Sequence, residues 1–338
     1  MNLLVTGGAG FIGANFAHYA TERGHTVLVY DLLTYAGNPK NIAGLPHFVK
    51  GDIRNANELD SVFERGISGM IGHPGRPFDA VVNFAAESHV DRSISLALPF
   101  VETNVLGAVT LLEAARRHAV PTFIQISTDE VYGSIEGTGK FTPASCLKPS
   151  SAYSASKAAA DQLLLSYHHT HGMDVRVTRC TNNYGPFQHP EKFIPMVLSN
   201  ALAHQPITIY GDGRQVRDWI FVQDHCDGIL QVIERGTSGG IYHFGGRGLD
   251  GNESGISNLE LVHLLLRILS KHTKLDLADL SKLICHVPDR LGHDRRYALD
   301  WSLSSEELGW VPKVELEDGL EKTVEWWLGN QDWWNGVS

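Results

Sequence analysis

Short apolar segments alternate with helical patterns through the first half of the chain, and this alternation constrains the fold more than any other feature. Six segments rich in β-branched residues end at turn or polar residues, as buried strands do: NLLVTG, TVLVYD, HFVKGD, AVVNFAAE, TFIQIST and VRVTRC. Between them, FIGANFAHYATERG, NVLGAVTLLEAARRHA and SASKAAADQLLLSYHHTHG carry apolar residues at helical spacing. The sequence therefore predicts an α/β fold, a Rossmann-type doubly wound parallel sheet with helices on both faces.

The pattern changes near residue 186, where Pro and Gly interrupt the chain and isolated helices follow. We therefore predict a Rossmann domain over residues 1–185, with a returning segment at about 216–245. A smaller C-terminal substrate-binding lobe is expected over residues 186–215 and 246–338. Such a lobe would close over a substrate held at the edge of the sheet.

The composition excludes several classes of function. The net charge of -10 over 338 residues provides no basic surface, so we expect neither nucleic acid nor membrane as a partner. The four cysteines lie far apart and form no CxxC pair, which predicts neither a disulfide framework nor a thiolate zinc site. The histidines of HHTHG follow a helix without a carboxylate cluster, so no metal is expected. No apolar run approaches about 20 residues, and we expect a cytoplasmic enzyme.

A glycine loop follows the first predicted strand. In VTGGAGFIG, Gly7, Gly10 and Gly13 stand between a strand and a helix, where glycines allow a tight turn and close approach of a pyrophosphate to the helix N-terminus. Asp31 ends the next predicted strand, where its carboxylate would hold the adenosine ribose hydroxyls and repel a 2'-phosphate. The loop and the acid together predict NAD as the cofactor, in preference to NADP.

The YSASK segment places Tyr153 and Lys157 at positions i and i+4, on one face of a helix. An ammonium group there would lower the pKa of the phenol toward the working pH, which makes the tyrosine a usable base. Thr128 ends a predicted strand beside Asp129 and Glu130, in STDEVYG. Three proton-handling groups at one strand end indicate a catalytic site.

Five motifs together resemble the extended short-chain dehydrogenase/reductases over nearly the whole chain: GGAGFIG, NFAAES, STDEVYG, YSASK and NNYGP. More narrowly, the chain resembles dTDP-glucose 4,6-dehydratases in STDEVYG, NNYGPFQHPEKFIP, IYGDGRQVRDWIFVQDH and DRLGHDRRYALD. The resemblance implies a homodimer that depends on NAD and takes a dTDP-hexose as substrate. The implied reaction dehydrates dTDP-glucose to dTDP-4-keto-6-deoxyglucose.

The chemistry of this reaction assigns a role to each acidic group. The C5 hydrogen of a hexose becomes acidic only after C4 is oxidised to a ketone, so Tyr153 would take the C4 hydroxyl proton while NAD takes the hydride. In the family, the position of Glu130 is the base at C5 and that of Asp129 is the acid at C6. The hydride then returns to C6. For Asp129 to carry a proton near neutral pH, burial or the nearby Glu130 must raise its pKa.

The candidate site residues form three sets. The catalytic set is Thr128, Asp129, Glu130, Tyr153 and Lys157. The cofactor-binding set is Gly7, Gly10, Phe11, Ile12, Gly13, Asp31, Asp52, Ile53, Ala85, Ala86, Thr103, Tyr153, Lys157 and Asn183. The substrate-binding set is Ser88, Thr128, Asn182, Glu191, Lys192, Arg217, Asn252, Arg290 and His293. The segment that holds Asn252, GGRGLDGNESG, is longer than the family pattern.

Two other readings remain open. A nucleotide-sugar epimerase or decarboxylase of the same superfamily shares the glycine loop, Tyr153 and Lys157 but does not need Asp129 with Glu130. A non-catalytic NAD-sensing protein would keep the loop and lose the tyrosine or the lysine. The sequence leaves open the nucleobase, the sugar configuration, the pathway and the oligomeric state, as well as the roles of the insertions near 66–77 and 247–256.

Overall fold

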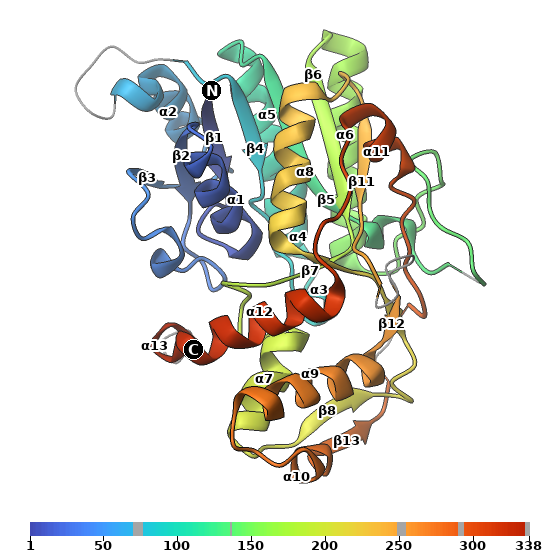
Figure 1. Ribbon diagram of the computed structural model, residues 1–338. Coiled ribbons are helices and arrows are strands. Elements are labelled where there is room, and N and C mark those ends of the chain that lie inside the picture. The colour runs from blue at the N-terminus through green and yellow to red at the C-terminus, as the bar shows by residue number, and fades with distance from the viewer. Residues whose placement is uncertain (70–76, 136, 249–254, 290–293, 335–338) are drawn as a thin grey trace.

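A seven-stranded parallel sheet forms the centre of the molecule, with strand order β11-β6-β5-β4-β1-β2-β3 (Figure 1). The structure is a computed structural model and describes residues 1–69, 77–135, 137–248, 255–289 and 294–334. The strands of this sheet are β1 (Asn2–Thr6), β2 (Thr26–Asp31), β3 (His47–Lys50), β4 (Ala80–Asn83), β5 (Thr122–Thr128), β6 (Asp174–Cys180) and β11 (Ile241–Phe244). All six predicted strands lie in it, and the predicted Rossmann-type fold is confirmed.

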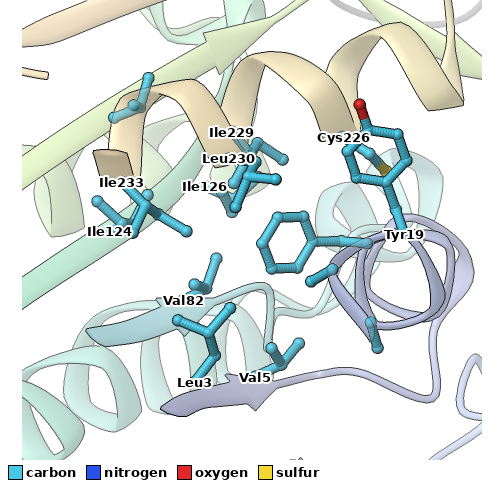
Figure 2. Close-up of a cluster of buried hydrophobic side chains, with 14 of the residues drawn as sticks. Leu3, Val5, Tyr19, Val82, Ile124, Ile126, Cys226, Ile229, Leu230 and Ile233 are labelled. Carbon is cyan, nitrogen blue, oxygen red and sulfur yellow. The ribbon is translucent and has the colours of Figure 1, made fainter. Parts of the chain in front are cut away.

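Helices cover both faces of the sheet because the central strands are apolar on both sides. One face carries α1 (Phe11–Glu22), α8 (Val222–Arg235) and α11 (Ser302–Leu308), and the other carries α2 (Ala56–Gly69), α5 (Ala108–Arg117) and α6 (Ala152–His171). Figure 2 shows the core on the first face, where Leu3, Val82 and Ile124 of the sheet meet Ile229 and Ile233 of α8.

A second hydrophobic cluster lies at the carboxyl ends of the strands, in the lower part of Figure 1. Its helices are α7 (Phe193–Leu202), α9 (Asn258–His272), α10 (Leu277–Ser281), α12 (Leu316–Gly329) and α13 (Gln331–Trp334). Three two-stranded sheets accompany them: β7 (Asn182–Tyr184) with β10 (Trp219–Phe221), β8 (Ile207–Tyr210) with β13 (Ile284–Val287), and β9 (Val216–Arg217) with β12 (Ile256–Ser257). Leu308 and Trp310 pack in the sheet's cluster and not in this one.

The remaining elements are short and lie along the connections near the strand ends. They are η1 (Pro39–Ile42), α3 (Val90–Ser95), α4 (Leu98–Phe100), η2 (Val101–Gly107) and η3 (Asp129–Tyr132). The first and last are 3-10 helices, and η2 is a π-helical segment that joins α4 to α5.

One continuous helical stretch, Leu98–Arg117, has the length and composition of a membrane-crossing helix. The sequence analysis considered only uninterrupted apolar runs, and this stretch contains charged residues such as Glu102 and Glu113, so it was not identified. Within the fold, 44% of the apolar segment of this helical stretch is buried, and Leu111 and Leu112 have no exposed surface. A core helix of a folded protein passes the same test of length and composition, so the stretch is weak evidence for a membrane.

Candidate active site

A cavity of about 520 Å³ opens at the carboxyl ends of the parallel strands. This edge is where open α/β sheets bind their ligands, beside the point at which the strand order reverses. The whole predicted catalytic set and the whole predicted cofactor-binding set line the cavity. The fold therefore brings together residues that lie up to 176 positions apart, from Gly7 to Asn183.

The glycine loop closes one end of this cavity. Gly7 has a φ of +68°, and a Cβ added there would lie 2.5 Å from the backbone nitrogen of Ala85. A Cβ on Gly13 would lie 2.4 Å from the carbonyl oxygen of Gly7. Only glycine fits at these two positions, so the loop brings bare backbone to the cavity wall. Gly10 caps α1 without a side-chain hydrogen bond, which leaves backbone N–H groups at the helix N-terminus for an anion.

Asp31 lies at the end of β2 and is 9% exposed. Its Oδ2 accepts a hydrogen bond from the backbone N–H of Ala9 at 2.9 Å, and its Oδ1 accepts one from Leu33 at 2.7 Å. Burial raises the pKa of this carboxyl, and the two backbone hydrogen bonds oppose the shift. Asp31 therefore links the second strand to the glycine loop and presents its carboxylate on the cavity wall.

Asp52 and Arg54 form an ion pair on the same wall. Arg54 Nη2 lies 2.6 Å from Asp52 Oδ2. Burial alone would raise the pKa of Asp52, but the hydrogen bonds from Arg54 lower it. Arg54 lines the cavity and was not among the predicted residues; its place two positions after a strand-end aspartate was the available signal.

Tyr153 and Lys157 extend from the first two turns of α6 into the cavity. Lys157 Nζ donates a hydrogen bond to the carbonyl oxygen of Ile126 at 2.6 Å. Burial, followed by the negative charges of Glu130 and Asp129 among its neighbours, raises the pKa of Tyr153 well above its usual value of 10.0. The sequence analysis expected Lys157 to lower this pKa, but the shift is in the opposite direction. Burial and the carboxylates raise the pKa, and the hydrogen bond with Thr128 only partly opposes them.

The two carboxylates of STDEVYG follow directly after β5, in η3. Thr128 is the N-cap of this short helix, and its hydroxyl accepts a hydrogen bond from the backbone N–H of Glu130 at 3.2 Å and donates one to Asp129 Oδ1 at 3.2 Å. Asp129 is 2% exposed, and its Oδ2 is buried without a hydrogen-bond partner. Burial first, and then the charge of Glu130, raise the pKa of Asp129 well above its usual value. A protonated carboxyl that lines a cavity is suited to donate a proton.

The predicted substrate-binding residues divide into three groups. Ser88, Asn182, Glu191 and Lys192 line the cavity together with Thr128. Arg217 is not part of the described lining, because its guanidinium donates to the backbone oxygens of Asp294 and Val216 and lies 4.4 Å from the centre of the Tyr297 ring. Asn252, Arg290 and His293 lie outside the described residues.

Asn183 receives support from a buried histidine that the sequence analysis did not identify. His225, on α8, is fully buried, and its Nδ1 lies 2.8 Å from Asn183 Oδ1. Burial lowers the pKa of His225 to about 3, so the ring is neutral and its Nδ1–H donates to the amide oxygen. The Asn183 amide nitrogen donates to Thr181 O at 3.0 Å, which fixes the orientation of the side chain.

No metal was expected from the sequence. Among the described residues, one group of three, His272, Glu321 and Glu325, has ligand atoms close enough for an ion. Glu321 Oε1 already accepts hydrogen bonds from Lys271 at 2.7 Å and from His272 at 2.9 Å. The group lies on α9 and α12 and does not line the cavity.

Comparisons with known proteins show which family the chain resembles over its length. The family model for GDP-mannose 4,6 dehydratase matches residues 4–323. A dTDP-glucose 4,6-dehydratase of Xanthomonas campestris is 46% identical over 99% of this chain and 95% of its own, and one of Streptomyces antibioticus is 47% identical over 99% and 94%. The solved structure of DesIV, a dTDP-glucose 4,6-dehydratase from Streptomyces venezuelae with NAD bound, matches both chains in full, with a TM-score of 0.89 and 44% identity.

A UDP-glucose 4-epimerase from Thermotoga maritima is more distant, at 28% identity and a TM-score of 0.85 over 98% of this chain and 100% of its own. The resemblance found in the sequence motifs is confirmed. The chain belongs to the GDP-mannose 4,6 dehydratase family.

Proposed function

We propose that the protein is an NAD-dependent hydro-lyase that converts dTDP-glucose to dTDP-4-keto-6-deoxyglucose and water. The observation that carries this proposal is the meeting of two residue pairs in one cavity, Tyr153 with Lys157 and Asp129 with Glu130. Its dehydratase relatives are similar over nearly the full length of the chain.

The described residues fit NAD at the glycine-loop end of the cavity. Gly7 and Gly13 leave room for close approach to the backbone, the N-terminus of α1 offers N–H groups to a pyrophosphate, and Asp31 offers oxygens to ribose hydroxyls. NAD, when bound, supplies the acceptor for a hydride and returns it later in the same turnover. Since Asp31 would lie beside a 2'-phosphate, its charge favours NAD over NADP.

Oxidation at C4 needs a base for the hydroxyl proton. Tyr153 fills this role, with Thr128 as its hydrogen-bonding partner. Lys157 is fully buried, and although burial lowers its pKa, the charge of Asp161 opposes the shift and favours the ammonium form. The positive charge one helical turn from Tyr153 stabilises its phenolate form, which accepts the C4 hydroxyl proton and thereby becomes a neutral phenol.

Elimination needs a base at C5 and an acid at C6. Once C4 is a ketone, the C5 hydrogen is acidic enough for a carboxylate, and Glu130 takes it. Asp129 gives its proton to the C6 hydroxyl, so that water and not hydroxide leaves. Two observations support this assignment: Oδ2 of Asp129 has no hydrogen-bond partner in the protein, and the pKa of the carboxyl is raised. A proton on Oδ2 is therefore available to the substrate.

The remaining substrate contacts are proposals as well. Four further residues of the cavity wall would hold the diphosphate and the sugar: Ser88, Asn182, Glu191 and Lys192. Arg217 would contact the nucleotide only after its hydrogen bonds to backbone oxygens are exchanged. Residues 1–185 with 216–245 would form the NAD-binding domain, and 186–215 with 246–338 the nucleotide-sugar lobe.

The reaction is tested by incubating the purified protein with dTDP-glucose and, separately, with UDP-glucose. A 4-keto-6-deoxy sugar absorbs in alkali, and its appearance with dTDP-glucose, together with the loss of one water in the mass spectrum, is the expected result. Formation of dTDP-galactose without loss of water would favour the epimerase reading. Added NAD should not be consumed, because the hydride that leaves C4 returns to C6.

We propose further that the chain forms a homodimer in the cytoplasm. Five large apolar side chains between the end of α3 and η2 are 48–61% exposed: Ile94, Leu96, Leu98, Val101 and Leu106. Leu163 of the neighbouring α6 is 39% exposed. A patch of this kind on a folded chain marks a surface that a second copy covers. Free thiols at all four cysteines and the negative net charge support a reducing compartment and argue against nucleic acid as a partner.

A further inference from the structure

A chain of four buried polar side chains joins α6 to η3 beneath the cavity. Arg179, on β6, lies at its centre and is 1% exposed. Its Nε donates to Asp161 Oδ2 at 3.0 Å, and its Nη1 donates to the hydroxyl of Tyr132 at 2.5 Å. The Tyr132 hydroxyl in turn lies 2.7 Å from Nε2 of His243, on β11. The chain therefore spans one helix, one 3-10 helix and two strands.

Two members of this network, the neighbours of Arg179 on either side, lie on the elements that carry the two catalytic pairs. Asp161 follows Tyr153 on α6 by about two helical turns. Tyr132 ends η3, the 3-10 helix that begins with Asp129. Ser127 of β5 also donates to Asp161 Oδ2, at 2.9 Å, immediately before the strand ends. Arg179 is thus hydrogen-bonded on one side to α6, which carries Tyr153 and Lys157, and on the other to η3, which carries Asp129 and Glu130.

Stability alone does not explain an ion pair at this depth. Asp161 is 0% exposed, and burial raises its pKa even though Arg179 and Lys157 oppose the shift. A buried ion pair gives little net stabilisation, because the desolvation of both charges offsets most of their attraction. A buried, hydrogen-bonded network does restrict the geometry of the groups that it joins. This network of four side chains restricts the relative positions of α6 and η3, whose reacting groups must act on neighbouring carbons of one substrate.

We propose that Arg179 is a positioning residue. Through Asp161 and Tyr132 it fixes the position of the elimination pair, Asp129 and Glu130, relative to the oxidation pair, Tyr153 and Lys157. This inference rests on the proposed function, because it assumes that both pairs act on one substrate. Loss of the Tyr132 hydroxyl frees η3 but leaves Arg179 bonded to α6. The oxidation step therefore stays close to its normal rate, while the elimination step slows.

The test is Tyr132→Phe, with Tyr242→Phe as the matched control. Both tyrosines are 1% exposed, and each hydroxyl has two partners; those of Tyr242 are the backbone N–H of Thr237 at 2.8 Å and Glu307 Oε2 at 2.7 Å. Tyr242 does not line the cavity. The two variants therefore remove the same group at the same burial, and only one of them touches the proposed chain.

The readout is a single turnover of dTDP-glucose followed by NADH absorbance, with mass spectrometry of quenched samples for loss of water. In Tyr132→Phe, NADH should form within about twofold of the wild-type rate and persist, because elimination slows about tenfold when the acid and base are displaced by a fraction of an ångström. Tyr242→Phe should show the wild-type ratio of the two steps.

Three results separate the possibilities. If Tyr132→Phe slows both steps by the same factor, as a general loss of stability would, the positioning role is overturned. If Tyr132→Phe does not fold, Arg179→Lys carries the same expectation, since a lysine ammonium keeps the charge beside Asp161 but lacks the second arm toward Tyr132. If the wild-type protein forms no 4-keto sugar at all, the proposed function itself fails, independently of the ratio of steps.

Discussion

Trp333, near the end of the described chain, connects to the glycine loop through one side chain. Its indole Nε1 donates to Asn41 Oδ1 at 2.7 Å. Asn41 is 1% exposed, and its Nδ2 donates to the carbonyl oxygen of Ala9 at 2.9 Å. The N–H of Ala9 donates to Asp31. We therefore predict that Trp333→Phe, which removes the indole N–H and keeps an aromatic ring, weakens NAD binding.

The magnitude follows from the loss of one hydrogen bond to a buried amide. Such a bond contributes about 1 kcal/mol net, and this amount corresponds to about a fivefold increase in the Kd for NAD if the ordering of the loop depends on it. The smaller ring also leaves a gap beside Trp326 and Trp327, so the unfolding temperature falls. Trp334→Phe is the control, because its Nε1 donates to Trp327 O at 3.1 Å and has no link to the loop.

The assay is a titration of nucleotide-depleted protein with NAD and, in parallel, with dTDP. Trp333→Phe should raise the Kd for NAD about fivefold and leave that for dTDP within about twofold, while Trp334→Phe should leave both nearly unchanged. If both variants lose stability equally and neither changes the Kd for NAD, the link through Asn41 has no functional effect. Equal weakening of both ligands by Trp333→Phe would indicate a general disturbance of the fold.

Three other predictions concern single side chains. Because burial raises the pKa of Asp129, its contribution to stability is fully present below its ordinary value of 3.8 and is lost as pH rises through the raised pKa. Asp129→Asn should remove this loss of stability at high pH, so that above the raised pKa the variant unfolds at a higher temperature than the wild type. It should also abolish elimination. An unchanged dependence of the unfolding temperature on pH would contradict this prediction. Asp31→Ser should narrow the preference for NAD over NADP about tenfold in relative Kd, and a wild type that binds both equally would disprove the ribose assignment. Leu98→Lys with Leu106→Lys should give a monomer by analytical ultracentrifugation, whereas Leu277→Lys, at a side chain 38% exposed on α10, should not.

The frame of the site was predictable from the sequence because it depends on local patterns. Alternating strands and helices specify the parallel sheet, and the carboxyl ends of parallel strands meet at one edge, so motifs at strand ends must converge there. The positions of Gly7 and Thr128 therefore follow from the predicted order of strands and helices alone. Gly7 lets the backbone come close to a ligand and Thr128 caps a helix, and neither role depends on contacts between distant segments.

The support beneath the site was not predicted, because it depends on contacts between distant segments. Asp161 and Arg179 are 18 residues apart, and Tyr132 and His243 are 111 apart, and no local pattern specifies their pairing. A signal was nevertheless present: Asp161 follows Lys157 by four residues on the buried face of α6, and Arg179 lies in the last part of a strand predicted to be buried. A charged residue at a position that periodicity assigns to the core requires a partner.

The direction of the Tyr153 pKa shift was wrong for a related reason. The YxxxK spacing places an ammonium group one helical turn from the phenol, but it carries no information on what else enters the cavity. In the fold, burial raises this pKa most, and the turn after β5 adds the negative charges of Glu130 and Asp129. The spacing within one helix specifies neither of these influences.

The comparison between dehydratase and epimerase relatives shows where the choice of reaction lies. The epimerase from Thermotoga maritima matches this fold with a TM-score of 0.85, close to the 0.89 of the dehydratase DesIV, although its identity is 28% and not 44%. A fold that dehydratases and epimerases share this closely does not by itself determine whether the reaction is elimination or epimerisation. In the proposed mechanism both reactions begin with oxidation at C4, which we assign to Tyr153 and Lys157. Elimination also needs a second acid and base, so we infer that the choice of reaction depends on Asp129 and Glu130 and on the residues that hold them in place relative to α6.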